Sequence, residues 1–145
     1  MRILVGWDDV AQGETIALIL GVDDTEAVVA TTPMQLLTYA HAERNWDVVL
    51  LAIGHPDVEA SLEVFRGIRK LLPEVPVVGA CDPAEVIRMA RFLTQGMKAY
   101  VLRDANDDFI FLLHATLMNT VEAVQAERER EISEKLREEI DSVRK

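Results

Sequence analysis

The stretch DVVLLAIGHPD, residues 47–57, decides how this chain folds. It contains a continuous apolar run, Val48 to Ile53, that begins after an acid and ends at Gly54. A short apolar run with such boundaries is typical of a strand that is buried on both faces of a sheet. In parallel α/β sheets the binding sites lie beyond the carboxyl ends of the strands. Ala52 therefore occupies a position where a functional residue would be expected, and its methyl group carries no chemistry.

Strand-like and helix-like segments alternate on both sides of this run. Apolar segments predict strands at residues 2–7, 27–32, 48–53, 75–81 and 99–102. Apolar residues at helical spacing predict helices at 11–20, 33–45, 58–72, 83–95 and from 107 to the end. We expect Asp82 to cap the fourth helix. This alternation predicts an α/β, flavodoxin-like fold with a doubly wound five-stranded parallel sheet of order 2-1-3-4-5.

Composition excludes several classes of protein. A formal net charge of −10 argues against binding to nucleic acid, because that affinity depends on a basic surface. No apolar run approaches the roughly 20 residues of a membrane span, so we expect a cytoplasmic protein with no membrane partner. Cys81, the single cysteine, excludes an internal disulfide and gives no metal-binding spacing.

The last predicted helix changes character at about residue 121. Residues up to 120 are apolar enough to pack on the sheet, so we expect a domain at 1–120 and a linker helix at 121–145. The linker has one narrow stripe among charged residues. Its members are Val121, Gln125, Arg128, Ile132, Leu136, Ile140 and Val143. Such a stripe needs a partner helix, and we expect a coiled coil that pairs two copies.

The spacing of the stripe predicts its geometry. Val121, Ile132 and Val143 recur every 11 residues, which corresponds to a nearly straight or slightly right-handed coiled coil. The alternative is a solvated single helix, held by pairs such as Glu131 with Lys135. The chain also ends in mid-pattern, which suggests that a longer protein continues beyond it.

The order of the elements, the acids after the first strand and the phrase DVVLLxIxxPD resemble the CheY-like receiver domain of bacterial response regulators over residues 1–120. In that family an aspartate at the end of the third strand accepts a phosphoryl group. Acids after the first strand bind magnesium, a serine or threonine ends the fourth strand, and a lysine ends the fifth. This chemistry needs a carboxylate nucleophile and a cation that neutralises the transferred group.

This chain departs from the family pattern at four separate positions, and only the acids after the first strand look retained. The resemblance places the phosphoacceptor at Ala52 and the strand-four hydroxyl at Cys81. The lysine position holds Arg103, and the proline that follows it in the family is replaced by an aspartate. A strict count puts Trp7 and Asp8 at the two acid positions, and Asp9 replaces the missing acid only by a one-residue slip. Tyr100 matches the switch aromatic of the family, although a half-buried strand residue is the simpler interpretation.

These departures indicate a degenerate pseudo-receiver without catalytic residues. We expect no cofactor and no enzyme activity, with at most weak magnesium binding at Asp8 and Asp9. As a hypothesis, Arg103 pairs with Asp8 or Asp9 across the former site, because a guanidinium binds a carboxylate bidentately. The resemblance implies a signalling module that dimerises and relays or scaffolds regulation to a downstream output domain.

The sequence leaves the contact face and two other functions open. The dimer forms through the last helix alone or also through the face of the fourth helix, fifth strand and fifth helix. That face includes Ile87, Arg88, Arg91 and Gln95. One alternative function is a receiver phosphorylated on an atypical residue such as Asp57 or His55. The other is a sensor that binds a small ligand or anion in the emptied pocket near Arg103.

Overall fold

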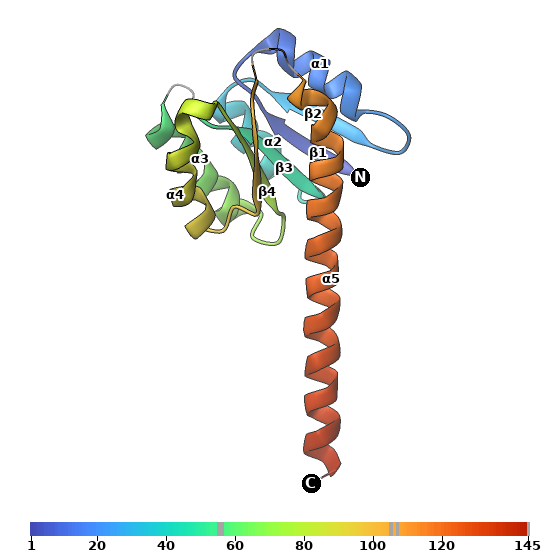
Figure 1. The fold of residues 1–145 in the computed structure, drawn as a ribbon. Coiled ribbons are helices and arrows are strands. Elements are labelled where there is room, and N and C mark those ends of the chain that lie inside the picture. The colour runs from blue at the N-terminus through green and yellow to red at the C-terminus, as the bar shows by residue number, and fades with distance from the viewer. Residues whose placement is uncertain (55–56, 105, 107, 145) are drawn as a thin grey trace.

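A parallel sheet of five strands forms the centre of the molecule (Figure 1). The computed structural model describes residues 1–54, 57–104, 106 and 108–144. The strands are β1 (Arg2–Gly6), β2 (Glu26–Ala30), β3 (Val48–Ala52), β4 (Val77–Cys81) and β5 (Ala99–Leu102). Their order in the sheet is β2-β1-β3-β4-β5, which confirms the predicted topology. All neighbouring strands pair in parallel, so their carboxyl ends lie at one edge.

Helices cover both faces of the sheet (Figure 1). They are α1 (Val10–Leu20), α2 (Pro33–Ala42), α3 (Val58–Leu71), α4 (Met89–Thr94) and α5 (Phe109–Arg144), with a 3₁₀ segment η1 (Pro83–Arg88) before α4. One buried cluster joins α1 and α5 to the sheet, and the other joins α2, α3 and α4 to its opposite face. The three-layer architecture expected from the alternating pattern is therefore present.

The central strand contributes to both clusters. Val49 and Leu51 belong to the cluster on the α2–α3 side, and Leu50 and Ala52 belong to the cluster on the α1–α5 side. All five residues of β3 are buried. The alternation follows from the two-residue period of a strand, and the burial of both faces explains why the run is apolar throughout.

Two of the predicted boundaries that differ from the structure lie at the starts of helices. The strand predicted at 27–32 ends at Ala30, since Thr32 caps α2 by accepting a hydrogen bond from the Gln35 amide. The prediction that Asp82 caps the fourth helix is wrong. The Asp82 side chain makes no capping bond, and its backbone carbonyl accepts from Glu85 N–H in a 3₁₀ turn. This segment buries no residue, so no packing holds it in an α-helix.

Helix α5 spans 36 residues and projects from the domain as a single rod (Figure 1). Phe109, Ile110, Leu113 and Leu117 are buried against the sheet. One helix in the described structure, Phe109–Val143, is long and apolar enough to cross a membrane by length and composition. Packing on the sheet accounts for much of the apolar character of its first half, and charged residues fill the second half. We therefore retain the expectation of no membrane partner.

Candidate functional site

An ion pair between Arg103 and Asp8 dominates the carboxyl edge of the sheet. Nη1 of Arg103 donates to Oδ2 of Asp8 at 2.9 Å, and Nη2 donates to Oδ1 at 3.0 Å. Arg103 follows β5 and Asp8 follows β1, with β3 and β4 between these strands, so the guanidinium reaches over the ends of both. The side chains are only 15% and 19% exposed. Solvent therefore screens this pair less than a surface pair.

Two further side chains hold the guanidinium in place. Nη2 of Arg103 also donates to Oε1 of Gln12 at 2.8 Å, and the indole N–H of Trp7 donates to the same oxygen at 2.7 Å. The guanidinium carbon lies 4.6 Å from the centre of the Trp7 ring, within the range of a cation–π interaction. Trp7 in turn stacks on Phe109, the first residue of α5, with ring centroids 6.2 Å apart. The arrangement therefore connects β1, α1, the end of β5 and α5.

Three other aspartates at this edge accept hydrogen bonds from backbone amides. Asp9 caps α1 by accepting from the Gln12 amide, and Asp57 caps α3 by accepting from the Ala60 amide. Asp104 accepts from the amide of Asp108. Among the described residues, no three His, Cys, Asp or Glu side chains come together as a metal site. With both Asp8 oxygens bound by Arg103, the residues present do not fit a magnesium ion.

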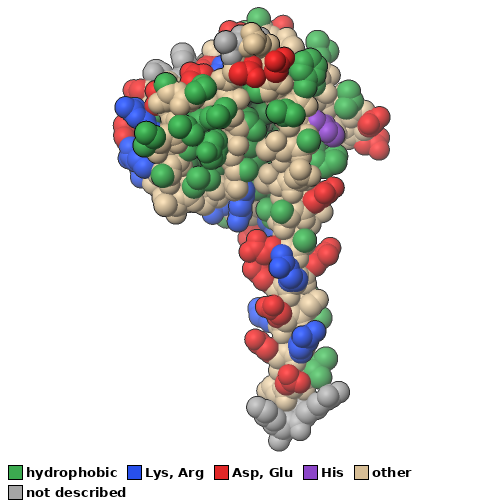
Figure 2. Space-filling model, in the orientation of Figure 1, with side chains coloured by type: hydrophobic (Ala, Val, Ile, Leu, Met, Phe, Trp, Pro, Cys, Tyr) green, Lys and Arg blue, Asp and Glu red, His purple; other side chains and the backbone are tan. Residues whose placement is uncertain are grey.

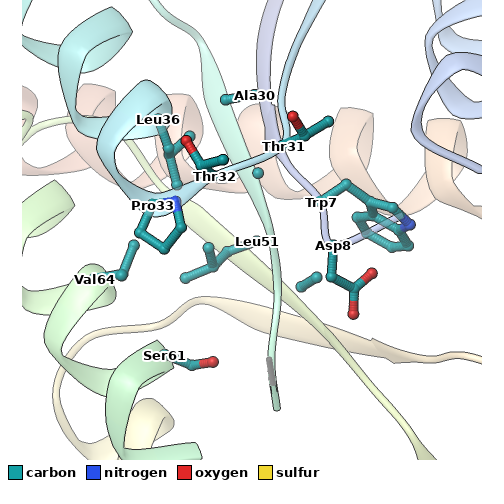
Figure 3. A pocket seen from close by; sticks show the side chains of 12 residues that line it. Trp7, Asp8, Ala30, Thr31, Thr32, Pro33, Leu36, Leu51, Ser61 and Val64 are labelled. Atoms are coloured by element: carbon teal, nitrogen blue, oxygen red, sulfur yellow. The ribbon is translucent and has the colours of Figure 1, made fainter. Parts of the chain in front are cut away.

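A small cavity of about 40 Å³ opens beside the ion pair, between the ends of β1, β2 and β3 (Figure 3). Its walls are mainly apolar, with hydroxyl groups of Thr31, Thr32 and Ser61 and the carboxylate of Asp8 among them. Ala52 also lines it. In Figure 3 the Trp7 ring points away from Leu36 and Pro33, which close the opposite wall. No lysine or arginine is among the described residues that line the cavity, and Arg103 lies outside it.

Solved structures with a similar fold include receiver domains. The fold matches a receiver domain protein from Methanospirillum hungatei with a TM-score of 0.74 at 24% identity, covering 87% of this chain and 97% of that one. A receiver domain protein from Clostridium thermocellum matches with a TM-score of 0.72 at 20% identity, covering 86% and 97%. The chain has the receiver-domain fold. No family model and no curated protein matches it.

A third match includes the long helix. It is a yeast Spc42 trimeric coiled coil fused to another structure, with a TM-score of 0.69 at 20% identity, and it covers 100% of both chains. A receiver-like domain continued by a long helix is therefore a shape already found in solved structures. The likeness concerns the fold alone.

Ala52 and Cys81, which the sequence resemblance assigned to the acceptor and hydroxyl positions, carry no group that transfers phosphate. Ala52 ends β3 and pairs in register with Ala80 of β4. Cys81 is fully buried, and burial together with the nearby charges of Asp82 and Glu85 raises its pKa to about 11. Its thiol is therefore protonated at neutral pH and is neither a nucleophile nor a metal ligand.

The remaining predicted residues lie apart from the ion pair. Tyr100, which the sequence resemblance matched to the switch aromatic, is about one third exposed on the edge strand β5. Arg91 forms an ion pair with Glu59 of α3, and Arg66 of α3 donates to Gln95. These contacts turn Arg91 and Gln95 toward α3. Asp57 caps α3, and His55 lies outside the described residues.

Sequence reasoning missed Gln12 and the role of Trp7. It placed Trp7 at an acid position without assigning it a partner, and Gln12 lies within a helix where amphipathic spacing gives no sign of a site. The only sequence signal is the five-residue separation of these two side chains, which lets a cap at Asp9 bring them together. A spacing this general does not identify a hydrogen bond.

Proposed function

We propose that the chain is a pseudo-receiver, a signalling module that acts without phosphorylation of an aspartate. The observation that carries this proposal is the bidentate pair of Arg103 with Asp8 beside Ala52. In an active receiver the corresponding space serves a phosphorylated carboxylate and a magnesium ion. Here a permanent cation neutralises the remaining acid, so phosphate and metal have no free partner charge to stabilise them.

The ion pair fixes the end of β5 relative to Asp8. A receiver that is switched by phosphate needs its fifth strand to respond to the state of the acceptor. In this chain the guanidinium connects the end of β5 to Asp8 and Gln12 in the absence of phosphate. We therefore propose that any signal enters through binding of a partner, and that the module relays or scaffolds it through α5 to a downstream output domain.

Dimerisation through α5 is part of the proposal. Beyond Arg128 the large apolar side chains of α5 that the structure describes are strongly exposed. They are Ile132, Leu136, Ile140 and Val143. Arg128 itself contacts Glu74 of the same chain through an ion pair, so it anchors the helix to the domain. A partner helix on the remaining stripe would remove these four side chains from water.

Light scattering tests this part of the proposal. We expect the full chain to be a dimer, with the same mass in the presence and absence of magnesium and acetyl phosphate. A version that ends at Arg128 retains the contact with Glu74 and loses the exposed stripe, so it is expected to be monomeric. A full chain that is monomeric, or that dimerises only after phosphorylation, would contradict the proposal.

The cavity in Figure 3 favours a second candidate, a small-ligand sensor. Hydroxyl groups and a carboxylate on apolar walls suit a small neutral or cationic molecule with hydrogen-bond donors. They do not suit an anion, because no basic side chain described in the structure lines the cavity. A thermal-shift screen of small neutral and cationic compounds tests this function. Substitution Ser61→Val is expected to abolish any stabilisation found, whereas Thr38→Val on the exposed side of α2 is the matched control.

A further inference from the structure

Exposed apolar side chains extend along α5 well above the linker. Phe111 and Met118, which belong to the part of α5 that packs on the sheet, are 72% and 37% exposed. Phe111, Met118, Gln125 and Ile132 follow one another at intervals of seven residues. Seven residues are nearly two helical turns, so these side chains lie on one side of the helix. Leu136, Ile140 and Val143 continue the row after an insertion of four residues, which locally unwinds a coiled coil.

This row, which we call the long stripe, lies on the α1 side of α5. Phe111 and its neighbour Ile110 line a groove together with Ala11, Thr15 and Ile19 of α1. The β5 side of the helix is formed by different residues. Thr116, Asn119 and Ala123 line a second groove with Lys98 and Ala99. The long stripe therefore faces away from β5.

We infer that a second copy of this chain covers the long stripe, in a parallel pair that extends from Phe111 to Val143 and faces α1. The inference rests on the proposed dimer and specifies which surface forms it. The exposed parts of the six apolar side chains amount to on the order of 600 Å² per chain, close to the roughly 800 Å² per partner of a stable interface. The four residues of the linker alone provide roughly 400 Å², which is about half of that area.

The sequence of the stripe selects the parallel orientation. In a parallel pair each apolar residue meets its own counterpart, and Gln125 meets Gln125 of the partner, where the two amides can bond to each other. A single polar residue in an apolar seam fixes register and the number of strands. In an antiparallel pair centred on the same stripe, Gln125 would lie opposite Glu129, so the two Gln125 amides could not bond to each other.

The pairing leaves a different apolar face uncovered. Figure 2 shows green side chains gathered on the domain beside α5, apart from those along the protruding helix. Exposed residues of η1 and β5 include Ile87, Tyr100 and Leu102. A straight α5 cannot present the long stripe and its β5 side to the same partner helix. The α4–β5 face is therefore available for another protein rather than for the second copy.

Substitutions at two neighbouring residues test which side of α5 contacts the second copy. Phe111 and Leu112 are 72% and 65% exposed, and they point to different sides of α5. We expect Phe111→Lys to weaken dimerisation of the full chain at least tenfold in sedimentation equilibrium. Leu112→Lys, on the β5 side, is the matched control and is expected to leave the dissociation constant within twofold of wild type. The reverse order of effects would overturn the inference.

Disulfide cross-linking tests the length and orientation of the pair. A bridge requires Cα atoms within about 7 Å, and the buried Cys81 does not compete. Under mild oxidation, Met118→Cys and Leu136→Cys are each expected to give covalent dimers in most of the protein. Arg130→Cys lies seven residues after Ala123, on the β5 side, and Ile87→Cys lies on η1. Both are expected to remain unlinked.

Each other outcome has a definite meaning. Linkage at Leu136→Cys without linkage at Met118→Cys would show that only the linker pairs, or that the helices are antiparallel and meet elsewhere, and would overturn the long stripe. Linkage at Ile87→Cys would assign the dimer to the α4–β5 face and overturn it as well. A full chain that is monomeric by light scattering would overturn the proposed dimer itself, so the two failures can be told apart.

Discussion

Arg103 combines three interactions in one side chain. It binds Asp8 bidentately, donates to Gln12 and lies over the ring of Trp7. Lysine, which the sequence resemblance led us to expect here, carries a compact charge and cannot form the same fork. Arginine therefore suits a site that binds a carboxylate bidentately.

Removing Arg103 should destabilise the fold measurably. We expect Arg103→Ala to lower the free energy of unfolding by about 2 kcal/mol, because it leaves a partly buried Asp8 without its cation and ends the contact with Trp7. Urea unfolding of Arg103→Ala, Asp8→Ala and the double variant measures the coupling, expected at about 1 kcal/mol or more. Additive effects of the two single variants would show that the pair contributes no coupling energy.

Cys81 is expected to be unreactive in the folded protein. Its pKa is raised to about 11, mainly by burial, and only the thiolate attacks a thiol reagent. At pH 8 the native chain should react at least 100-fold more slowly than the chain in denaturant.

The raised pKa of Cys81 also predicts how the stability of the fold changes with pH. Its contribution to stability is complete below the pKa of the unfolded thiol and is lost as pH rises toward 11, an effect that Cys81→Ala should remove.

For single residues, the sequence predicts a side-chain contact only where opposite charges follow strands that end at the same edge of the sheet. Arg103 and the acids after β1 were identifiable because a basic and an acidic side chain end strands at one edge of a sheet. Gln12 and the stacking of Trp7 on Phe109 were not identifiable. They depend on the rotation of α1 and the start of α5, which tertiary packing determines.

At the scale of elements, Asp9 shows how a possible metal ligand is instead a helix cap. Its carboxylate accepts from the Gln12 amide at the start of α1. Asparagine caps as well as aspartate, whereas alanine does not. We therefore expect Asp9→Asn to keep the stability of wild type and Asp9→Ala to lose about 1 kcal/mol in chemical denaturation. A loss of magnesium binding in Asp9→Asn, measured by calorimetry, would instead assign Asp9 to a metal site.

Strands were easier to predict than the ends of helices. The range 99–102 agrees with β5, and the central run agrees with β3 within one residue, because a buried parallel strand leaves a continuous apolar signal. The start of α4 differed, since an acid before Pro83 indicates a cap whether or not its side chain reaches an amide. Packing on neighbouring elements decides that outcome.

For the whole molecule, the fold and the chemistry of its site have to be argued from different residues. The topology was predictable because alternating strands and helices permit few arrangements. The same topology carries many functions, so the receiver-domain fold does not by itself imply phosphoryl transfer. The substitutions at the carboxyl edge carry the functional argument, and α5 connects that edge, through Phe109 and Trp7, to the end of the chain.

The rod formed by α5 makes the two ends of the molecule different. The ion pair lies at one end of the domain, and the helix leaves from the other, past Arg128 and Glu74. A partner that shifts β5 would move Arg103 and, through Trp7, the first turn of α5. We expect Arg103→Ala to change the fluorescence of Trp7 while the mass in light scattering stays that of a dimer, because the pairing surface lies on another side of the helix.

Intact mass after treatment with acetyl phosphate and magnesium shows whether this chain can be phosphorylated. The full chain is incubated beside an active receiver domain that serves as the positive control. We expect the mass of this chain to stay unchanged while the control gains one phosphoryl group, because Ala52 offers no nucleophile and Arg103 occupies the carboxylate of Asp8. A gain of one phosphoryl group on an aspartate of this chain would contradict the pseudo-receiver and establish a phosphorylatable receiver in its place.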